Sequence, residues 1–133
     1  MKKYLLIFFV FTMSSSSSIY AQKNKIASED FNDFFKKFKS DSKFQVSRVL
    51  FPLKYQMNND DFELADYTIS KDKYKVLKLN NKADEKYLKR IISINKQKAT
   101  LQQRGLDNGI YIDYIFELKD NKWFLKTWID QST

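Results

Sequence analysis

A small polar cluster stands inside one of the most apolar stretches of the sequence. Gln45, Ser47 and Arg48 lie within DSKFQVSRVLFPL (residues 41–53), where most of the other side chains are large and apolar. When such polar groups are buried they must form hydrogen bonds, because an unsatisfied one costs about 1–3 kcal/mol. An arginine also presents a planar fork that binds a carboxylate through two parallel hydrogen bonds.

Two roles fit this cluster, and the sequence leaves both open. In the binding role, Gln45 and Arg48 project to one side of a short helix and hold an anion at a cleft. In the structural role, Arg48 pairs with Asp113 or Asp130, and Gln45 satisfies backbone groups at the end of a helix. The candidate binding residues are Gln45, Arg48, Tyr114 and Thr127.

The chain lacks two residue types on which much enzyme chemistry depends, because it contains no histidine and no cysteine. This excludes disulfides, thiolate nucleophiles, the commonest general base and the commonest transition-metal ligand. The carboxylate pairs Asp60-Asp61 and Asp84-Glu85 lie in turn-like, solvated segments without apolar neighbours that would raise a pKa. We therefore expect no catalytic residues, no metal site and no cofactor, with a carboxylate-dependent enzyme as the alternative.

The N-terminus has the pattern of a cleaved secretory signal. Lys2 and Lys3 precede an apolar run over residues 4–13, and a small-residue stretch ends at Ala21. The apolar run is too short to span a bilayer as a helix. We predict that cleavage leaves Gln22 as the first residue and a secreted or periplasmic protein without a membrane span. The absence of cysteine excludes a lipoprotein.

Removal of residues 1–21 as a signal peptide leaves residues 22–133, which we expect to form a single domain. Loss of the two signal lysines lowers the formal charge from +8 to +6. Because the cations are mostly lysines scattered among acids, and planar phosphate recognition favours arginine, we expect no nucleic-acid partner.

Residues 28–39 (SEDFNDFFKKFK) predict the first helix, with Ser28 as its N-cap. Its apolar stripe is formed by Phe31, Phe34, Phe35 and Phe38. This spacing places all four side chains on one helix face, which we expect to cover a core rather than a lipid or a partner. Asp41 and Ser42 are predicted to cap a second short helix that ends near Ser47.

The period then changes to that of a strand over residues 48–56 (RVLFPLKYQ). Pro52 cannot donate to a strand ladder, so this strand should lie at a sheet edge or carry a bulge. Residues 58–61 (NNDD) predict a turn, and residues 62–69 (FELADYTI) a returning partner strand.

Residues 70–79 (SKDKYKVLKL) are compatible with helix or strand, and we assign them a short helix in which Tyr74 and Leu77 face inward. Four antiparallel strands follow, in the segments EKYLKRIISI (85–94), QKATLQQR (97–104), IYIDYIFEL (110–118) and WFLKTWI (123–129).

A two-residue turn at Asp120-Asn121 predicts the register of the last two strands. One face then holds the pairs Leu118–Trp123, Phe116–Leu125, Tyr114–Thr127 and Ile112–Ile129. The other holds Glu117–Phe124, Ile115–Lys126, Asp113–Trp128 and Tyr111–Asp130. The first set is almost wholly apolar and should face the core beneath the phenylalanine stripe.

The second, mixed face carries an aromatic and aliphatic patch among charged residues. The candidate interface residues are Tyr111, Ile115, Phe124 and Trp128. An exposed patch of this kind suggests an association surface, for which a two-fold homodimer is the simplest arrangement. The alternative is that a loop, or residues 70–79, covers it.

This order of elements predicts an α+β fold with N-terminal helices packed on a curved antiparallel sheet. The segments FNDFFKKFKSDSKFQVSRVLFPL and GIYIDYIFELKDNKWFLKTWIDQS resemble a family of uncharacterised secreted bacterial domains with a nuclear-transport-factor-like (cystatin-like) fold. The pattern DSxFQxSRxxFP carries most of the resemblance. In the turn DNKW, Asn121 stands where glycine is frequent. The resemblance implies the fold and no activity.

The function is therefore unknown from the sequence, and two expectations follow. The first is a non-enzymatic binding module that holds a small-molecule or peptide ligand in a pocket between helices and sheet. The second is an interaction protein that dimerises or docks through the exposed sheet face.

Overall fold

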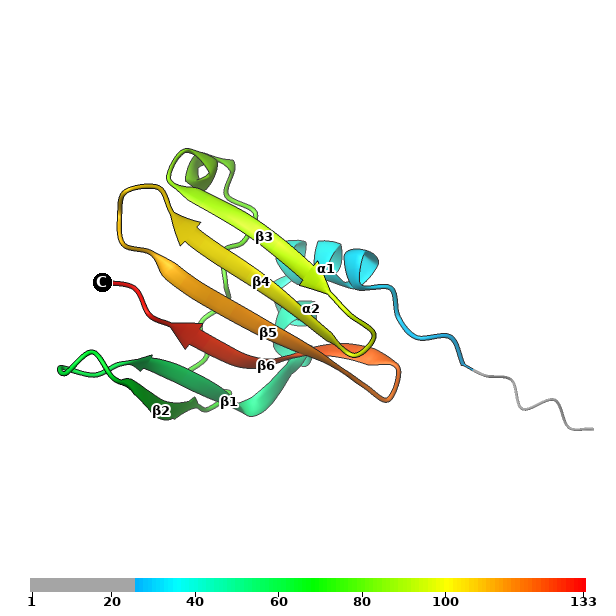
Figure 1. The fold of residues 1–133 in the computed structure, drawn as a ribbon. Coiled ribbons are helices and arrows are strands. Elements are labelled where there is room, and N and C mark those ends of the chain that lie inside the picture. Colours follow the sequence, from blue (N-terminus) through cyan, green and yellow to red (C-terminus); the bar gives the residue numbers. More distant parts are fainter. Residues whose placement is uncertain (1–25) are drawn as a thin grey trace, which may run out of the picture.

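A six-stranded sheet forms the centre of the computed structural model, which describes residues 26–133 (Figure 1). The predicted signal peptide and its cleavage site lie outside the described residues. The elements are the helices α1 (Phe31–Ser40) and α2 (Ser42–Ser47), the strands β1 (Val49–Asn58) and β2 (Leu64–Ile69), the 3₁₀ helix η1 (Lys82–Lys86), and the strands β3 (Leu88–Ile94), β4 (Lys98–Gly105), β5 (Tyr111–Lys119) and β6 (Lys122–Asp130).

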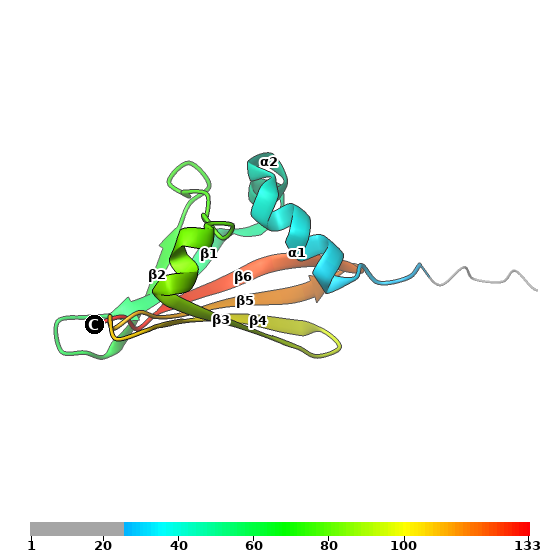
Figure 2. The same ribbon diagram turned by 90° about the horizontal axis from the view of Figure 1, so that it is seen from above.

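The strand order is β2-β1-β6-β5-β4-β3. Neighbouring strands are antiparallel except β1 and β6, which are parallel, so the sheet is mixed and departs at this pair from the wholly antiparallel prediction. Both α-helices and the segment that joins β2 to β3 lie on one face of the sheet, which we call the inner face (Figure 2). The opposite face is the outer face.

The helix α1 begins later than the sequence predicted. Asp30 is its N-cap and accepts a hydrogen bond from the Asp33 N–H at 3.0 Å. Ser28 instead donates its hydroxyl to the side-chain oxygen of Asn121 at 3.2 Å, and the Glu29 N–H donates to the Asn121 carbonyl at 2.9 Å. These bonds hold the preceding segment against the β5–β6 turn, so the helix cannot start at Ser28. The prediction for α2 is confirmed, because Asp41 caps it.

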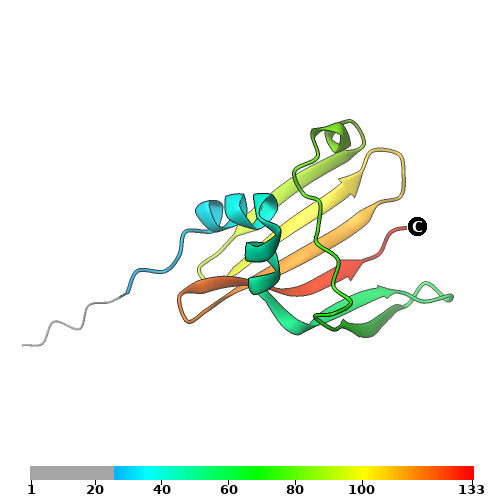
Figure 3. The same cartoon turned by 180° about the vertical axis from the view of Figure 1, so that it is seen from behind.

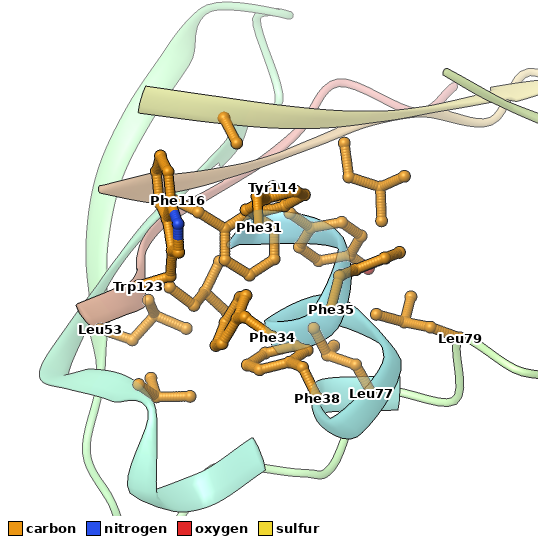
Figure 4. Close-up of a cluster of buried hydrophobic side chains, with 14 of the residues drawn as sticks. Phe31, Phe34, Phe35, Phe38, Leu53, Leu77, Leu79, Tyr114, Phe116 and Trp123 are labelled. Atoms are coloured by element: carbon orange, nitrogen blue, oxygen red, sulfur yellow. The ribbon is translucent and has the colours of Figure 1, made fainter. Parts of the chain in front are cut away.

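The phenylalanine stripe of α1 packs on the inner face as predicted (Figure 4). The Phe116 ring on β5 is the common contact, with centroid distances of 5.4, 5.8, 6.1 and 5.3 Å to Phe31, Phe34, Phe35 and Phe38. Phe116 and Leu125 are completely buried. Because each buried large apolar side chain contributes about 1.5–3 kcal/mol, this contact anchors the helix to the sheet.

The β5–β6 hairpin has the predicted turn, and both of its central residues have positive φ. The pairs Leu118–Trp123, Glu117–Phe124 and Phe116–Leu125 are confirmed. Beyond them the register shifts by one residue through a bulge, so that Ile115 faces Thr127 instead of Lys126. The predicted pairs Tyr114–Thr127, Ile112–Ile129, Ile115–Lys126, Asp113–Trp128 and Tyr111–Asp130 are therefore wrong; the observed pairs include Tyr114–Trp128, Asp113–Ile129 and Ile112–Asp130.

Pro52 lies at an irregularity in β1. This strand lies between β2 and β6, so it is not an edge strand, but its register with β6 shifts between Val49 and Lys54. The predicted hairpin of β1 with β2 is confirmed, and of the two explanations for Pro52 the bulge holds.

The predicted helix over residues 70–79 does not form. A single turn closes when the Lys73 N–H donates to the Ser70 carbonyl at 3.1 Å, and the chain then crosses the inner face without regular structure (Figure 3). Tyr74 and Leu77 nevertheless face the core, as predicted. The backbone of Leu77 is bonded to a side chain of α2, described below, and is not available to a helix.

Candidate functional site

Gln45 is a completely buried amide that joins α2 to the segment crossing the inner face. Its Oε1 accepts hydrogen bonds from the Tyr74 hydroxyl at 2.8 Å and from the Leu77 N–H at 2.6 Å. Its Nε2 donates to the carbonyls of Phe38 at 2.9 Å and of Leu77 at 3.1 Å. All four hydrogen-bonding positions of the amide are thus occupied within the chain, as the structural role requires.

Arg48 is an ion-pair residue whose partner differs from the prediction. Its guanidinium forms two parallel bonds to the Glu29 carboxylate, at 2.8 and 3.0 Å, and donates to the Trp123 carbonyl at 3.1 Å. The guanidinium carbon also lies 4.8 Å from the centre of the Phe44 ring. The predicted acids, Asp113 and Asp130, do not pair with it; Asp113 lies 2.8 Å from Arg104.

The environment of Glu29 favours its ionised form. Partial burial raises the pKa of this carboxyl, but the bonds from Arg48 and from the Trp123 N–H outweigh burial, and the net pKa is lower than its usual value. The Trp123 N–H donates to Glu29 Oε2 at 2.9 Å, and the Trp123 indole N–H donates to the Glu29 carbonyl at 2.8 Å. Glu29 and Arg48 together lock the segment before α1 to the start of β6.

The other two candidate binding residues do not join this lock. Tyr114 is buried on the inner face, where its hydroxyl accepts a long hydrogen bond of 3.4 Å from Gln103, and burial together with the charge of Asp130 raises its pKa. Thr127 pairs with Ile115 rather than Tyr114, so it does not share the face of Tyr114. The four predicted binding residues therefore do not converge on one cavity.

One of the four predicted interface residues lies on the opposite face of the sheet from the other three. Tyr111, Ile115 and Phe124 occupy the outer face, but the bulge in β6 pairs Trp128 with Tyr114, so Trp128 lies on the inner face. Its ring is 5.6 Å from the Tyr114 ring and 5.0 Å from the Tyr55 ring. Residues 70–79 cross the inner face, so the prediction that this segment covers the patch on the outer face is wrong (Figure 3).

A cavity of about 300 Å³ lies between α1, the segment 79–85 and strands β3 and β4. Its apolar lining consists of Phe35, Leu79, Ile92 and Leu101. Its polar lining consists of Lys39, Asn80, Asn81, Lys82, Glu85 and Arg90. This is a pocket between helix and sheet of the predicted kind, although none of the predicted binding residues lines it.

The charges around this cavity are predominantly positive. Arg90 is held in place, since it donates to Gln103 at 2.9 Å and to Asp84 at 3.3 Å. Among the described residues, Lys39 and Lys82 have no carboxylate within 4.0 Å, and the Lys39 ammonium lies 5.0 Å from the Phe35 ring centre. The arrangement can hold a small molecule that combines an apolar body with a negative group.

No motif or periodicity in the sequence identifies the residues that line this cavity. From the sequence alone, Lys39 is an ordinary basic residue in the last turn of a helix, and Arg90 is an ordinary charged residue within a strand. The path of residues 79–85 brings them to one site; residues 79–81 have no regular structure, and the short 3₁₀ helix η1 follows from Lys82. Among residues 26–133, no three histidine, cysteine or acidic side chains gather as a metal site would require, and no helix is long and apolar enough to cross a membrane.

Comparison with known structures identifies the fold. An NTF2-like protein from Bacteroides fragilis has a TM-score of 0.61 and 24% identity over 80% of this chain, which spans only about half (48%) of that protein. A cystatin-like protein from Bacteroides caccae has a TM-score of 0.55 and 22% identity over 78% of this chain and 77% of its own. A protein from Bacteroides uniformis has a TM-score of 0.51 and 26% identity over 76% of both chains.

Sequence comparison supplies the family but no activity. No curated protein matches the chain significantly. A family model that is described only by likeness ("-like") matches residues 29–131, from the segment before α1 to just beyond β6. The chain therefore belongs to the family that this model describes, an uncharacterised family with the NTF2-like, cystatin-like fold.

Proposed function

We propose that this protein is a non-enzymatic binding module that holds a small amphiphilic anion in the cavity between α1, residues 79–85 and strands β3 and β4. The observation that carries the proposal is the pairing of an apolar lining with two lysines, Lys39 and Lys82, that have no acidic partner among the described residues. A volume of about 300 Å³ lies at the lower end of ligand pockets, which favours a small molecule over a peptide.

The lining favours binding over catalysis. It contains no serine, threonine, tyrosine, histidine or cysteine, and Glu85 is its one carboxylate. Hydrolysis by carboxylates generally uses two such groups, either flanking the scissile bond or sharing a proton. The cavity offers only one exposed glutamate beside two lysines. Because this glutamate repels an anion, it limits the negative charge of a ligand that the site can accept.

Binding of matched amphiphiles tests the proposal. In calorimetric titrations of the purified protein, we expect octanoate to bind and octylamine to bind roughly tenfold more weakly or not at all, because a cation meets Lys39 and Lys82. Lys39→Glu and Lys82→Glu should weaken octanoate binding, while Lys36→Glu on the exposed side of α1 should leave it unchanged. Equal binding of both amphiphiles, absence of binding, or an equal loss in all three variants would contradict the proposal.

We also propose that the protein acts outside the cytoplasm after cleavage of a signal peptide. The charged start, apolar run and small-residue stretch before Gln22 support this location. The intact mass of the protein recovered from its native host should correspond to a chain that begins at Gln22. A mass that includes Met1 would overturn this part of the proposal.

The second candidate function, association through the outer sheet face, has weaker support. Tyr111, Ile115 and Phe124 lie on this face, but Arg104 stacks over the Tyr111 ring at 3.5 Å and also pairs with Asp113. The Lys126–Glu117 pair adds a second charged contact on the same face. A surface crossed by ion pairs offers little continuous apolar area to a partner, so the cavity is the favoured site.

A further inference from the structure

We propose that two copies of this protein associate through antiparallel pairing of their β3 strands, which joins the two sheets edge to edge. The strand β3 is the last strand on one side of the sheet, and within residues 26–133 nothing pairs with its free edge (Figure 1). The proposal concerns an edge of the sheet and does not depend on the cavity or its ligand.

The hydrogen bonds at the two ends of β3 show which backbone groups are free. Leu106 donates to the Tyr87 carbonyl and Asn95 donates to the Lys98 carbonyl, each at 2.8 Å, and the register between these pairs is unbroken. In an antiparallel pair, alternate residues direct both backbone groups to the same neighbour. Lys89, Ile91 and Ser93 are therefore bonded to β4. The N–H and C=O groups of the intervening residues point away from it; these are Leu88, Arg90, Ile92 and Ile94.

This edge lacks the features that usually prevent strand pairing. Natural edge strands are short, bulged or interrupted by proline or central charges. In contrast, β3 is seven residues long and regular, and its only charges are Lys89 and Arg90 near its start. Three of its last four side chains are isoleucines, Ile91, Ile92 and Ile94, with exposed fractions of 37%, 40% and 49%.

The opposite edge of the sheet provides an internal contrast. The strand β2 is shorter and carries Asp66 near its centre. Asp66 lies 3.8 Å from Lys54 and accepts a hydrogen bond from Gln56 at 2.7 Å, so a charge is held on this strand. A partner strand at β2 would meet this carboxylate, whereas the second half of β3 presents no charge.

The charge pattern of β3 favours a second copy as its partner. If the two-fold axis passes at Ile91, Leu88 faces Ile94 of the second copy and Arg90 faces Ile92. All free backbone groups of both strands are then paired. Lys89 faces Ser93, so no cation lies opposite another cation, whereas a parallel, in-register pair would set Lys89 against Lys89. The two Ile91 side chains meet at the axis.

A single cysteine tests this register, because the natural chain has none. Residues that face each other without mutual hydrogen bonds have Cα atoms about 4.5 Å apart, within the range for a disulfide. We expect Ile91→Cys to form a disulfide-linked dimer rapidly on mild oxidation. Lys89→Cys, on the same face two residues away, would lie about 13 Å from its counterpart and should remain largely uncrosslinked.

Sedimentation of the unmodified protein provides the second measurement. At micromolar concentration we expect a dimer, which Ile91→Lys should convert to a monomer because two lysines would meet at the axis. Thr68→Lys on the β2 edge should remain dimeric. A monomeric wild-type protein, equal crosslinking of both cysteine variants, or a dimer that Tyr111→Lys but not Ile91→Lys disrupts would overturn the proposal. Because Ile91 does not line the cavity, these results do not depend on octanoate binding.

Discussion

Arg48 connects three parts of the chain through one guanidinium group. It binds Glu29 before α1, the Trp123 carbonyl in β6 and the Phe44 ring in α2. Charged hydrogen bonds that are partly removed from water are among the stronger single contacts in a protein, provided that both partners keep their geometry. We therefore infer that the ionised pair holds the start of α1 against the start of β6 and does not bind a ligand.

The planar fork of Arg48 should not be replaceable by an ammonium group. Arg48→Lys retains the charge but cannot keep two parallel bonds to Glu29 and one to Trp123, so we expect a loss of about 2 kcal/mol in the free energy of unfolding. Urea denaturation measures this loss, and Lys43→Arg on the exposed surface of α2 is the control. In a double-mutant cycle with Glu29→Gln the two losses should be strongly non-additive. Additive losses, or wild-type stability, would contradict the role of the pair.

Glu29 also predicts a dependence of stability on pH. Folding lowers its pKa from the usual value of 4.5, so its stabilising contribution is complete above that value and is lost as pH falls through the folded pKa. Between pH 5 and pH 3, urea midpoints of the wild-type protein should therefore fall more steeply than those of Glu29→Gln. Parallel curves would show that the carboxylate contributes nothing to acid unfolding.

At the scale of elements, the sequence predicted correctly those helices and strands whose apolar residues repeat with a regular spacing. The stripe of α1 and the apolar face near the β5–β6 turn repeat with the spacing of helix and strand, and both were predicted correctly. The bulge beside Lys126 was not, because a two-residue turn fixes the register only as far as the first inserted residue. This single insertion moved Trp128 from one face of the sheet to the other.

The helix prediction for residues 74–79 was wrong for a different physical reason. The position of this segment depends on a side chain distant in sequence, since Gln45 takes both backbone groups of Leu77. Local helix propensity cannot compete with two buried hydrogen bonds whose loss would leave polar groups unsatisfied. The candidate cavity depends on the path of this segment, so neither could be predicted from local pattern.

Replacement of Gln45 should release this segment. Gln45→Leu keeps the approximate volume but leaves the Tyr74 hydroxyl, the Phe38 carbonyl and the Leu77 backbone without partners, so we expect a loss of at least about 3 kcal/mol in urea unfolding. Amide exchange at Leu77 should accelerate in the folded protein. Tyr74→Phe removes one bond and should cost only about 1 kcal/mol. Equal costs for the two variants, or unchanged exchange at Leu77, would show that Gln45 is not the anchor.

At the scale of the whole molecule, one continuous core joins both ends of the described chain. It includes Phe34 from α1, Leu53 from β1, Leu77 from the crossing segment, Leu101 from β4 and Leu125 from β6. Buried apolar side chains come from α1, β1, β4, β5, β6 and the crossing segment, so no division into separate cores is visible among residues 26–133. We therefore predict that the chain unfolds in one cooperative transition.

The two tryptophans permit a direct measurement of this cooperativity. Trp123 packs against Phe31 at 5.1 Å beneath α1, whereas Trp128 contacts Tyr55 and Tyr114 elsewhere on the inner face. In Trp128→Phe, fluorescence reports on Trp123, and in Trp123→Phe it reports on Trp128. Within each variant, the fluorescence midpoint in urea should coincide with that of far-ultraviolet circular dichroism, although Trp123→Phe should be less stable because it loses the bond to Glu29. If the Trp128 signal changes before the dichroism does, the strands β1, β2 and β6 separate from the helical core first, and the single-domain prediction is wrong.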